Sequence, residues 1–307
     1  IIVAVGADLY LPEGEYGYGK YPNVLTNFEL ESKSATMEGK SVTFIQCAGS
    51  REKGKECSRY CCQTAIKQAI ELRELGKEVT ILHRDIRTFS NEESYRRACE
   101  LGVQFIRFPD GKKPVVRQKD GKLFISVRDV MSGRNLEFST DGVVLSVAMT
   151  PSEDAKKMQQ LLRIPASKDG FFMELHPKLA PVETNTEGIY ICGCCQFPKD
   201  SSESIMQASA AASRAAILMA KGRILAEPVI ARVNGSLCRG CGICKEACEY
   251  NAIEIAEVRP MVQAARVNEV LCKGCGACAV ACPSRAIACQ HFTDSQILTV
   301  LRAAMEA

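Results

Sequence analysis

Eight cysteines near the C-terminus occur as two copies of one pattern. Each copy reads C-x2-C-x2-C-x3-C, and the second begins 34 residues after the first. The cysteines are Cys238, Cys241, Cys244 and Cys248 in the first copy, and Cys272, Cys275, Cys278 and Cys282 in the second. Thiolates at this spacing are the ligand set of two iron–sulfur cubanes. The pattern therefore predicts that the chain transfers electrons one at a time.

Glycines and short apolar segments repeat together with these cysteines. The glycines let the backbone curl and point its N–H groups at sulfur; they are Gly240, Gly242, Gly274 and Gly276. The apolar segments 252–255 and 286–288 follow the two copies, so we expect two loop–helix–strand units. In two-cluster ferredoxins the fourth cysteine of each run ligates the other cluster. We therefore expect one [4Fe-4S] cluster on Cys238, Cys241, Cys244 and Cys282, and another on Cys248, Cys272, Cys275 and Cys278.

Zinc binding and disulfide bonding are the alternatives for these eight cysteines. Zinc sites use pairs of cysteines or a mixture of cysteine and histidine, not four cysteines within eleven residues. None of the three histidines, His83, His176 and His291, has such a spacing to a cysteine, so we expect neither a zinc site nor a catalytic triad. Disulfides are typical of small secreted chains. The cluster interpretation is therefore favoured.

An α/β region precedes the cysteine repeat. Residues 41–46 and 78–82 are apolar runs typical of buried strands, and residues 58–75 between them have apolar side chains at helical spacing. Gly76 is placed to end the helix. The pattern predicts a strand–helix–strand unit of Rossmann type.

A second group of cysteines lies around the first loop of this unit. A nucleotide-binding unit carries G-x-G-x-x-G here, so that the phosphate can approach the helix N-terminus. This chain has Cys47-Ala-Gly-Ser-Arg51 instead, followed by Cys57, Cys61 and Cys62. The helix N-terminus would favour an anionic cluster as well as a phosphate. We hypothesise a third [4Fe-4S] cluster on Cys47, Cys57, Cys61 and Cys62; the spacing alone leaves buried, unligated cysteines open.

Composition limits the compartment and the class of partner. The 307 residues suffice for two or three domains, and the 17 cysteines follow no signal peptide, which indicates a cytoplasmic protein with reduced thiols. No run of 18 apolar residues occurs, so we expect no membrane span. The formal charge of +3 would become about −3 with three clusters of about −2 each. No basic stripe with interleaved aromatic residues indicates nucleic-acid binding.

Two further segments are typical of the halves of a flavin domain. Residues 1–8 and 188–193 each indicate a strand that ends in a turn of small residues, and residues 204–220 indicate an alanine-rich helix. Small residues at such a strand end allow the backbone to approach a cofactor closely. Each segment alone is more simply an ordinary strand. Their order around the strand–helix–strand unit is what favours a flavin site, and the start of the chain at Ile1 suggests a fragment.

Several features lie outside these sites. We expect Cys99 to be buried in helix packing, and Cys194 and Cys195 to pack in a core or loop, because thioredoxin-type dithiols are C-x-x-C. Residues 290–307 indicate an amphipathic helix that packs on its own domain through one apolar stripe. We expect no side chain to act as a catalytic nucleophile.

The chain resembles the HdrA family of heterodisulfide reductases over essentially its whole length, and corresponds to the C-terminal part of that family's chain. The matching stretches are residues 15–21 (Glu-Tyr-Gly-Tyr-Gly-Lys-Tyr), 44–51 (Phe-Ile-Gln-Cys-Ala-Gly-Ser-Arg), 57–62 (Cys-Ser-Arg-Tyr-Cys-Cys), 144–147, 195–200, 207–212 and the cysteine repeat. The second and third stretches are specific to the family, whereas the repeat is not. The resemblance supports the third cluster on Cys47, Cys57, Cys61 and Cys62.

The resemblance implies an α/β, Rossmann-like FAD/NAD-linked reductase fold of thioredoxin-reductase type, without its N-terminal part, followed by an α+β bacterial-type 2[4Fe-4S] ferredoxin domain. The implied segments are 1–36, the end of the first part of the FAD domain; 37–150, the inserted unit with the third cluster; 151–225, the second part of the FAD domain; 226–290, the ferredoxin domain; and 291–307, a C-terminal helix.

The resemblance also implies a set of FAD contacts. They are Gly6, Lys67, Gly193, Cys194, Lys199, Asp200, Gln207 and Ala208. Lys67 falls where the family places a lysine beside the flavin ring, and a cation there would stabilise reduced, anionic flavin. The alternative for Lys67 is a solvated helix lysine.

The implied function is flavin-based electron bifurcation from hydrogen or formate to ferredoxin and a disulfide-reducing subunit. The implied partners are HdrB-like and HdrC-like subunits, a small iron–sulfur subunit linked to a hydrogenase or formate dehydrogenase, ferredoxin, the missing N-terminal half of the FAD domain and a second copy in a dimer. Two alternatives remain open: a quinone-linked (Qmo-type) subunit that does not bifurcate, and an electron-wire module without a functional flavin.

Overall fold

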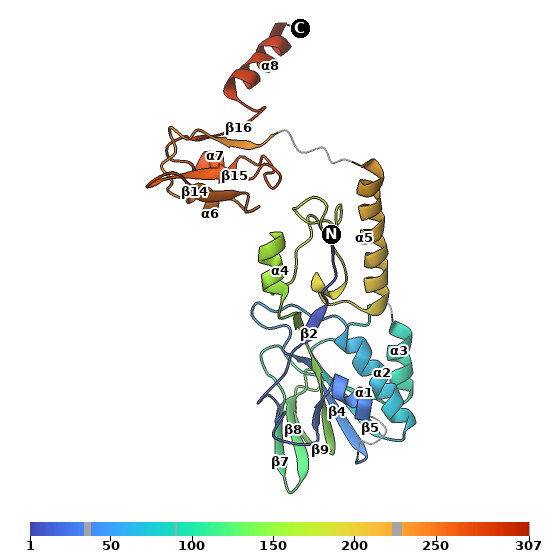
Figure 1. The fold of residues 1–307 in the computed structure, drawn as a ribbon. Helices are drawn as coiled ribbons and strands as arrows, with labels where there is room; N and C mark the ends of the chain where they lie inside the picture. The colour runs from blue at the N-terminus through green and yellow to red at the C-terminus, as the bar shows by residue number, and fades with distance from the viewer. Residues whose placement is uncertain (34–37, 90, 223–228, 307) are drawn as a thin grey trace.

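A five-stranded parallel sheet forms the centre of the larger domain (Figure 1). The computed structural model describes residues 1–33, 38–89, 91–222 and 229–306. The sheet order is β3 (Val24–Thr26), β10 (Gly142–Val147), β4 (Ser41–Ala48), β5 (Glu78–His83) and β6 (Gln104–Arg107), and all neighbours are parallel. The helix α2 (Cys61–Glu74) connects β4 to β5, which confirms the predicted strand–helix–strand unit.

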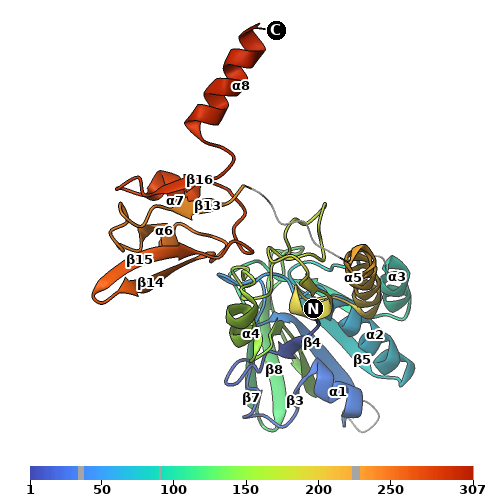
Figure 2. The same ribbon diagram turned by 45° about the horizontal axis from the view of Figure 1, so that its top comes forward.

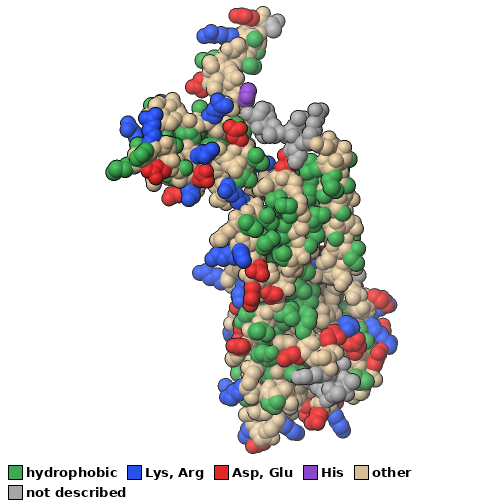
Figure 3. All heavy atoms as spheres, in the orientation of Figure 1, with side chains coloured by type: hydrophobic (Ala, Val, Ile, Leu, Met, Phe, Trp, Pro, Cys, Tyr) green, Lys and Arg blue, Asp and Glu red, His purple; other side chains and the backbone are tan. Residues whose placement is uncertain are grey.

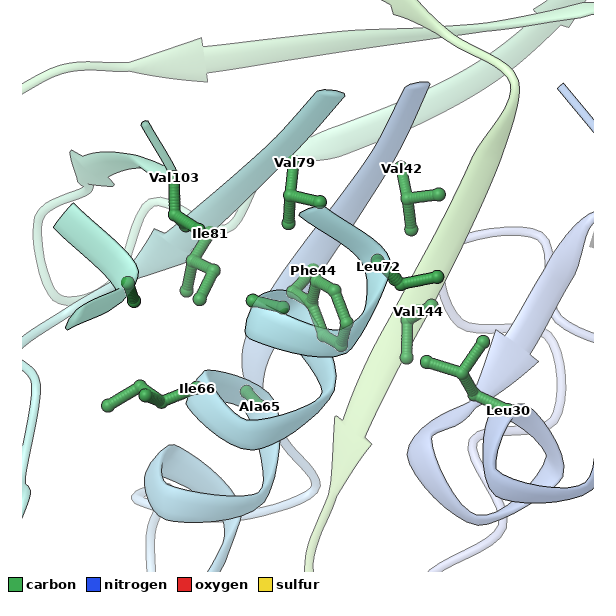
Figure 4. Close-up of a cluster of buried hydrophobic side chains, with 12 residues drawn as sticks. Leu30, Val42, Phe44, Ala65, Ile66, Leu72, Val79, Ile81, Val103 and Val144 are labelled. Atoms are coloured by element: carbon green, nitrogen blue, oxygen red, sulfur yellow. The ribbon is translucent and has the colours of Figure 1, made fainter. Parts of the chain in front are cut away.

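The two faces of the sheet are covered by different elements. Because side chains alternate along a strand, Phe44 and Ile45 of β4 enter different clusters. Phe44 packs with Ile66 and Leu72 of α2 (Figure 4), in the cluster that also includes residues of α1 (Asn27–Lys33) and α3 (Glu92–Glu100). Ile45 packs in a cluster with the meander β7 (Val115–Lys119), β8 (Lys122–Arg128) and β9 (Asn135–Thr140). Burial on both faces explains the continuous apolar runs of β4 and β10.

A second set of short elements adjoins this sheet. β1 (Ile2–Val3) pairs in parallel with β12 (Tyr190–Ile191), and β2 (Ala7–Leu9) pairs antiparallel with β11 (Met149–Pro151). The predicted strand 1–8 is therefore wrong as one element: Gly6, at φ +72°, lies between two short strands. The rest of this region is α4 (Ala155–Leu162), a 3₁₀-helix (Gly193–Cys195) and α5 (Ser201–Lys221).

The helix α5 begins three residues before the predicted start because of its cap. Asp200 accepts a hydrogen bond from the Glu203 N–H, and the Glu203 carboxylate accepts one from the Asp200 N–H. This reciprocal arrangement is a capping box, which satisfies two N–H groups at the helix start. The predicted alanine-rich helix is otherwise confirmed.

The expected domain boundaries at 36/37 and 225/226 fall outside the described residues. The elements β3 and α1 were expected in the first part of the FAD domain. However, β3 pairs with β10 in the five-stranded sheet, and Leu30 of α1 belongs to its core. Residues 24–26 therefore pair with this sheet, and Leu30 packs on it, while the domain bounds stay a prediction.

The cysteine repeat forms a separate small unit (Figure 2). Its order is β13 (Ala231–Val233), α6 (Ile243–Glu246), β14 (Ile253–Arg259), β15 (Val262–Val267), α7 (Ala277–Ala281) and β16 (Ile287–Cys289). β13 pairs antiparallel with β16, and β14 with β15. Each cysteine run begins in a loop and contains a short helix, and a strand follows it, which confirms the two predicted loop–helix–strand units.

Two packing predictions were wrong. The predicted C-terminal helix exists as α8 (Asp294–Glu306), but none of its residues is buried, so its apolar stripe does not pack on its own domain. Cys99 lies on α3 but is exposed, because the neighbouring Ala98 occupies the buried position. Within the described ranges, no helix has the length and apolar character needed to cross a membrane.

Candidate functional site

The second cysteine group converges where β4 meets α2. Cys47 lies near the end of β4, Cys61 and Cys62 begin α2, and these three are buried; Cys57, in the loop between, is partly exposed. Burial, with smaller contributions from the neighbouring Cys62 and Cys57, raises the pKa of the Cys47 thiol to about 11. A hydrogen bond with Cys62 and burial raise the pKa of Cys61, and the charges of Cys62, Cys47 and Cys57 add to this effect. The structure therefore brings the four thiols into one group.

The loop before α2 is held so that it leaves the helix N-terminus open. Tyr60, at the N-cap, makes no side-chain cap hydrogen bond, but its hydroxyl donates to the Val147 carbonyl at 2.6 Å. The Ser58 hydroxyl accepts from the Met149 N–H at 3.1 Å, and the Arg59 N–H donates to Cys57 Sγ at 3.4 Å. The first N–H groups of α2 are thus not engaged by a side-chain cap and can face an anion.

Basic side chains surround this thiol group. Arg51 pairs with Asp85, Arg87 pairs with the same carboxylate at 3.3 Å, and Arg84 donates to the Arg51 carbonyl at 2.7 Å. Arg51 and Arg84 both lower the pKa of Cys47 against the effect of burial. The Ser50 hydroxyl is buried without a hydrogen-bond partner. Four thiols, positive charge and an unsatisfied donor fit an anionic iron–sulfur cluster.

The cysteines of the repeat also lie in two groups. Burial raises the pKa of Cys278 to about 11, and the thiols of Cys289, Cys272, Cys248 and Cys275 contribute. Cys248 of the first copy is therefore close to the second copy's cysteines, as cross-ligation requires. Burial and then Cys238 and Cys241 raise the pKa of Cys244. The place of Cys282 in this other set stays a prediction. In the part of the chain that the structure describes, no three His, Cys, Asp or Glu side chains are arranged to hold a metal ion.

Backbone N–H groups point at sulfur throughout the repeat. The donors and acceptors are Ala231 to Cys272 (3.3 Å), Ala252 to Cys248 (3.3 Å), Ala265 to Cys238 (3.4 Å) and Ala286 to Cys282 (3.3 Å). Such hydrogen bonds stabilise negative charge on cluster sulfur and influence its reduction potential. These hydrogen bonds are of the kind that cluster sulfur needs, and the two ligand sets of the repeat stay predictions.

Two predicted FAD residues lie at neighbouring strand ends. Gly6 follows β1 and Gly193 follows β12, and these strands are parallel, so both glycines lie at the carboxyl edge where α/β sheets bind ligands. A Cβ atom on either glycine would meet no atom within 4 Å. The Gly193 N–H donates to Gln207 Oε1 at 2.7 Å, which holds the strand end against α5. The space beside these glycines can accept a cofactor.

Lys199 is buried at the same edge. Its Nζ lies 3.0 Å from Gln196 Oε1, 3.3 Å from the carbonyls of Gly193 and Phe197, and 3.1 Å from the centroid of the Phe197 ring. Burial lowers the pKa of Lys199 to about 8. A cation in this position can bind an anionic group of a ligand. Cys194 Sγ contacts the Lys199 carbonyl at 3.6 Å, Asp200 caps α5, and Ala208 is exposed on α5.

Lys67, in contrast to Lys199, is a solvent-exposed lysine of α2. It is on the exposed side of α2, and its Nζ pairs with Glu31 at 3.0 Å and with Glu71 at 3.4 Å. This arrangement favours the alternative of a solvated helix lysine. Of the two predicted lysines, Lys199 is the one that contacts Gly193 beyond the end of β12.

The contact between the cysteine group and the start of α5 was not predicted from the sequence. The Arg59 guanidinium pairs with Glu203 at 2.5 Å and stacks between Phe89 and Phe197, with centroid distances of 4.9 and 5.2 Å. Glu203 is 144 residues away in sequence, so no local pattern could indicate it. The only signal was Arg59's position between Cys57 and Cys61.

Comparison with known proteins finds matches both to the cysteine repeat and to nearly the whole chain. Residues 237–286 match the 4Fe-4S dicluster domain. The A subunit of the H(2):CoB-CoM heterodisulfide,ferredoxin reductase of Methanothermobacter marburgensis is 43% identical over 99% of this chain and 49% of its own length. The iron-sulfur A subunit of the CoB–CoM heterodisulfide reductase of Methanocaldococcus jannaschii is 42% identical over 100% of this chain and 50% of its own. The chain thus spans about half the length of these curated relatives.

Thioredoxin reductases are among the similar solved structures. That of Lactococcus lactis aligns with 72% of this chain and 65% of its own, with a TM-score of 0.49 and 23% identity. The α/β class of this chain rests on its own parallel strand order. From the 43% and 42% identities over nearly all of its residues, the chain belongs to the HdrA family of heterodisulfide reductases.

Proposed function

We propose that this chain is the electron-transferring part of a flavin-containing subunit in a heterodisulfide-reductase-like complex. It would carry three [4Fe-4S] clusters, on the ligand sets predicted above, and bind FAD at the strand ends that follow β1 and β12. The observation that carries this proposal is the adjacency of the four-thiol group to that edge, through Arg59 and Glu203. A one-electron centre beside a two-electron cofactor site is the arrangement that splitting an electron pair requires.

The proposed reaction divides electron pairs. FAD, when bound, supplies the conversion between two-electron and one-electron transfer. One electron of each pair from hydrogen or formate, delivered by partner subunits, reduces ferredoxin, and the other goes to a disulfide-reducing subunit. Two such pairs place two electrons on ferredoxin and two on the disulfide, which takes up two protons and becomes two thiols.

The side chains at the proposed flavin edge would bind and orient the cofactor. Gly6 and Gly193 leave the space for it, and Gln207 holds Gly193 in place. Lys199 provides a buried cation with no carboxylate among its hydrogen-bond acceptors, so it can stabilise negative charge on a bound cofactor. Asp200 and Cys194 complete the edge beside it.

An apolar face supports the proposal that the N-terminal half of the FAD domain completes this site. Hydrophobic side chains gather between α4 and α5, around the N-terminus (green in Figure 3). The exposed hydrophobic residues include Ile1, Ile2, Ile205 and Met219, and a cleft of about 520 Å³ is lined by Ile1, Tyr190 and Leu218. No other strand of the described chain pairs with β1 or β12. A further part of the FAD domain would cover this face.

The proposed partners follow from the same reaction. The ferredoxin-like unit would exchange electrons with a small iron–sulfur subunit of a hydrogenase or formate dehydrogenase, or with ferredoxin itself. Subunits similar to HdrB and HdrC would receive electrons for the disulfide, and two copies of the complex would associate as a dimer. The reduced thiols that cluster ligation needs are consistent with the cytoplasm.

The test is electron coupling in the purified complex with the full-length protein. FAD content is measured first, after denaturation. Ferredoxin reduction with hydrogen or formate is then measured with and without the CoB–CoM heterodisulfide. Reduction of ferredoxin only when the disulfide is present supports bifurcation. Quinone reduction without such coupling would instead identify the quinone-linked alternative, and a complex without bound flavin would leave the electron-wire module.

A further inference from the structure

Arg59 connects the loop of the third cysteine group to the helix that faces the proposed flavin edge. Its N–H donates to Cys57 Sγ at 3.4 Å, so its backbone contacts a proposed cluster ligand. Its guanidinium pairs with Glu203 at 2.5 Å, at the start of α5. One residue therefore contacts both sites, through its backbone and its side chain respectively.

The conformation of Arg59 is unusual for a residue with a side chain. Its φ is +59°, in the left-handed region, which costs an L-residue about 1 kcal/mol or more. Such a conformation persists where the surroundings determine it, and these positions cluster at functional sites. Here the surroundings are two aromatic rings, Phe89 and Phe197, and the carboxylate of Glu203.

The partners of Arg59 also belong to the flavin edge. The Phe197 ring contacts both the Arg59 guanidinium and the Lys199 ammonium. Glu203 closes the capping box with Asp200 and so orients the first turn of α5. A shift of Arg59 would therefore affect α5 through the ion pair with Glu203, and Lys199 through the shared contact with the Phe197 ring.

We propose that Arg59 is a positioning residue that holds the third-cluster loop against the start of α5 and thereby sets the rate of electron exchange between cluster and flavin. This inference rests on the proposed function. The guanidinium suits the task because it can stack on two rings and pair with a carboxylate at the same time, which a lysine ammonium cannot do equally well.

The test compares variants of the full-length protein within its complex. Glu203→Gln removes the charge partner, but the amide oxygen can still accept the Asp200 N–H of the capping box. Arg59→Gln removes the guanidinium, and Arg59→Lys keeps only the charge. Arg96→Gln, which breaks an exposed ion pair with Glu93 on α3, is the matched control. Iron and flavin contents, and the rate at which the third cluster's electron paramagnetic resonance signal appears after mixing with the electron donor, are measured for each.

We expect Arg59→Gln and Glu203→Gln each to slow this signal about tenfold at unchanged flavin content, and the double variant to be no slower than either. Arg59→Lys should recover only part of the rate, and Arg96→Gln should match the wild type. If Arg59→Gln loses iron, the rate measured for Glu203→Gln tests the inference instead, because this variant leaves the cysteine loop unchanged. A wild-type rate in Glu203→Gln overturns the inference. A wild-type complex without flavin or the third signal overturns the proposed function, and the inference with it.

Discussion

Gly274→Ala should weaken the cysteine repeat much more than Gly276→Ala, two residues away. A Cβ at Gly274 would lie 2.2 Å from the Val229 carbonyl oxygen, which belongs to the backbone and cannot rotate away. At Gly276 the nearest atom is Cys289 Sγ at 4.0 Å, an ordinary contact. Both glycines have positive φ, +62° and +80°, so backbone strain of about 1–2 kcal/mol applies to both variants. Only Gly274→Ala adds a steric cost, of about 1–3 kcal/mol.

The assay measures how fast the full chain loses iron to a ferrous chelator, and the decay of visible absorbance monitors this loss. A difference of about 1–3 kcal/mol corresponds to roughly a five- to 150-fold faster loss for Gly274→Ala if release follows local opening. Thermal unfolding of the same two variants should rank them in the same order. Equal rates for the two variants, or faster loss from Gly276→Ala, would refute the reasoning, because the strain they share would then be the whole effect.

Two other predictions concern the larger domain. Between about pH 10.5 and pH 8 the wild type should lose about 3 kcal/mol of stability relative to Lys199→Met, because burial lowers the folded-state pKa of Lys199 from 10.5 to about 8, an effect that Cys194, Cys195 and Glu203 partly offset. Between these two pKa values folding releases a proton, so the stability of the wild type relative to the variant rises from pH 8 to about 10.5. A relative stability of the wild type that falls over this pH range in denaturant titrations would contradict the lowered pKa of Lys199. Phe44→Ala should lower the free energy of unfolding by about 3–5 kcal/mol, because it leaves a cavity between β4 and α2. Val115→Ala, at an exposed position, should change it by less than about 1 kcal/mol. Similar losses for both variants would mean that the two-sided core is wrongly described.

Local patterns were sufficient for the central strands and for the cysteine repeat. The runs around Phe44 and Val79 are apolar on both faces, and such burial leaves a continuous signal in the sequence. The spacing of the cysteines likewise determined two loop–helix–strand units. These features depend on residues that are close together in the chain, so one sequence suffices to find them.

Features that depend on distant pairing could not be predicted in the same way. β3 has only three residues, and only its partner β10, more than a hundred residues later, makes it a strand of the sheet. The same holds for Arg59 and Glu203. The helix α8 was predicted correctly, but its packing was not. The helical spacing of apolar residues indicates an apolar face, but it does not indicate what covers that face.

The proposed FAD contacts divide in the same way, into those with a local sequence signal and those without one. Gly6 and Gly193 could be placed because a strand end next to a glycine is a local signal, and the parallel pairing of β1 and β12 then brings them together. Lys67 and Lys199 could not be distinguished by sequence pattern. Only the packing shows that Lys67 is solvated beside Glu31, whereas Lys199 is buried beside Phe197.

The number of iron atoms bound by this 307-residue chain decides whether the second cysteine group is a cluster site. Three [4Fe-4S] clusters would give about twelve iron atoms per chain, and Cys47→Ser should reduce this to about eight while the exposed Cys99→Ser leaves it unchanged. A wild-type protein with about eight iron atoms, unaffected by Cys47→Ser, would contradict the proposal that the four thiols where β4 meets α2 hold a cluster.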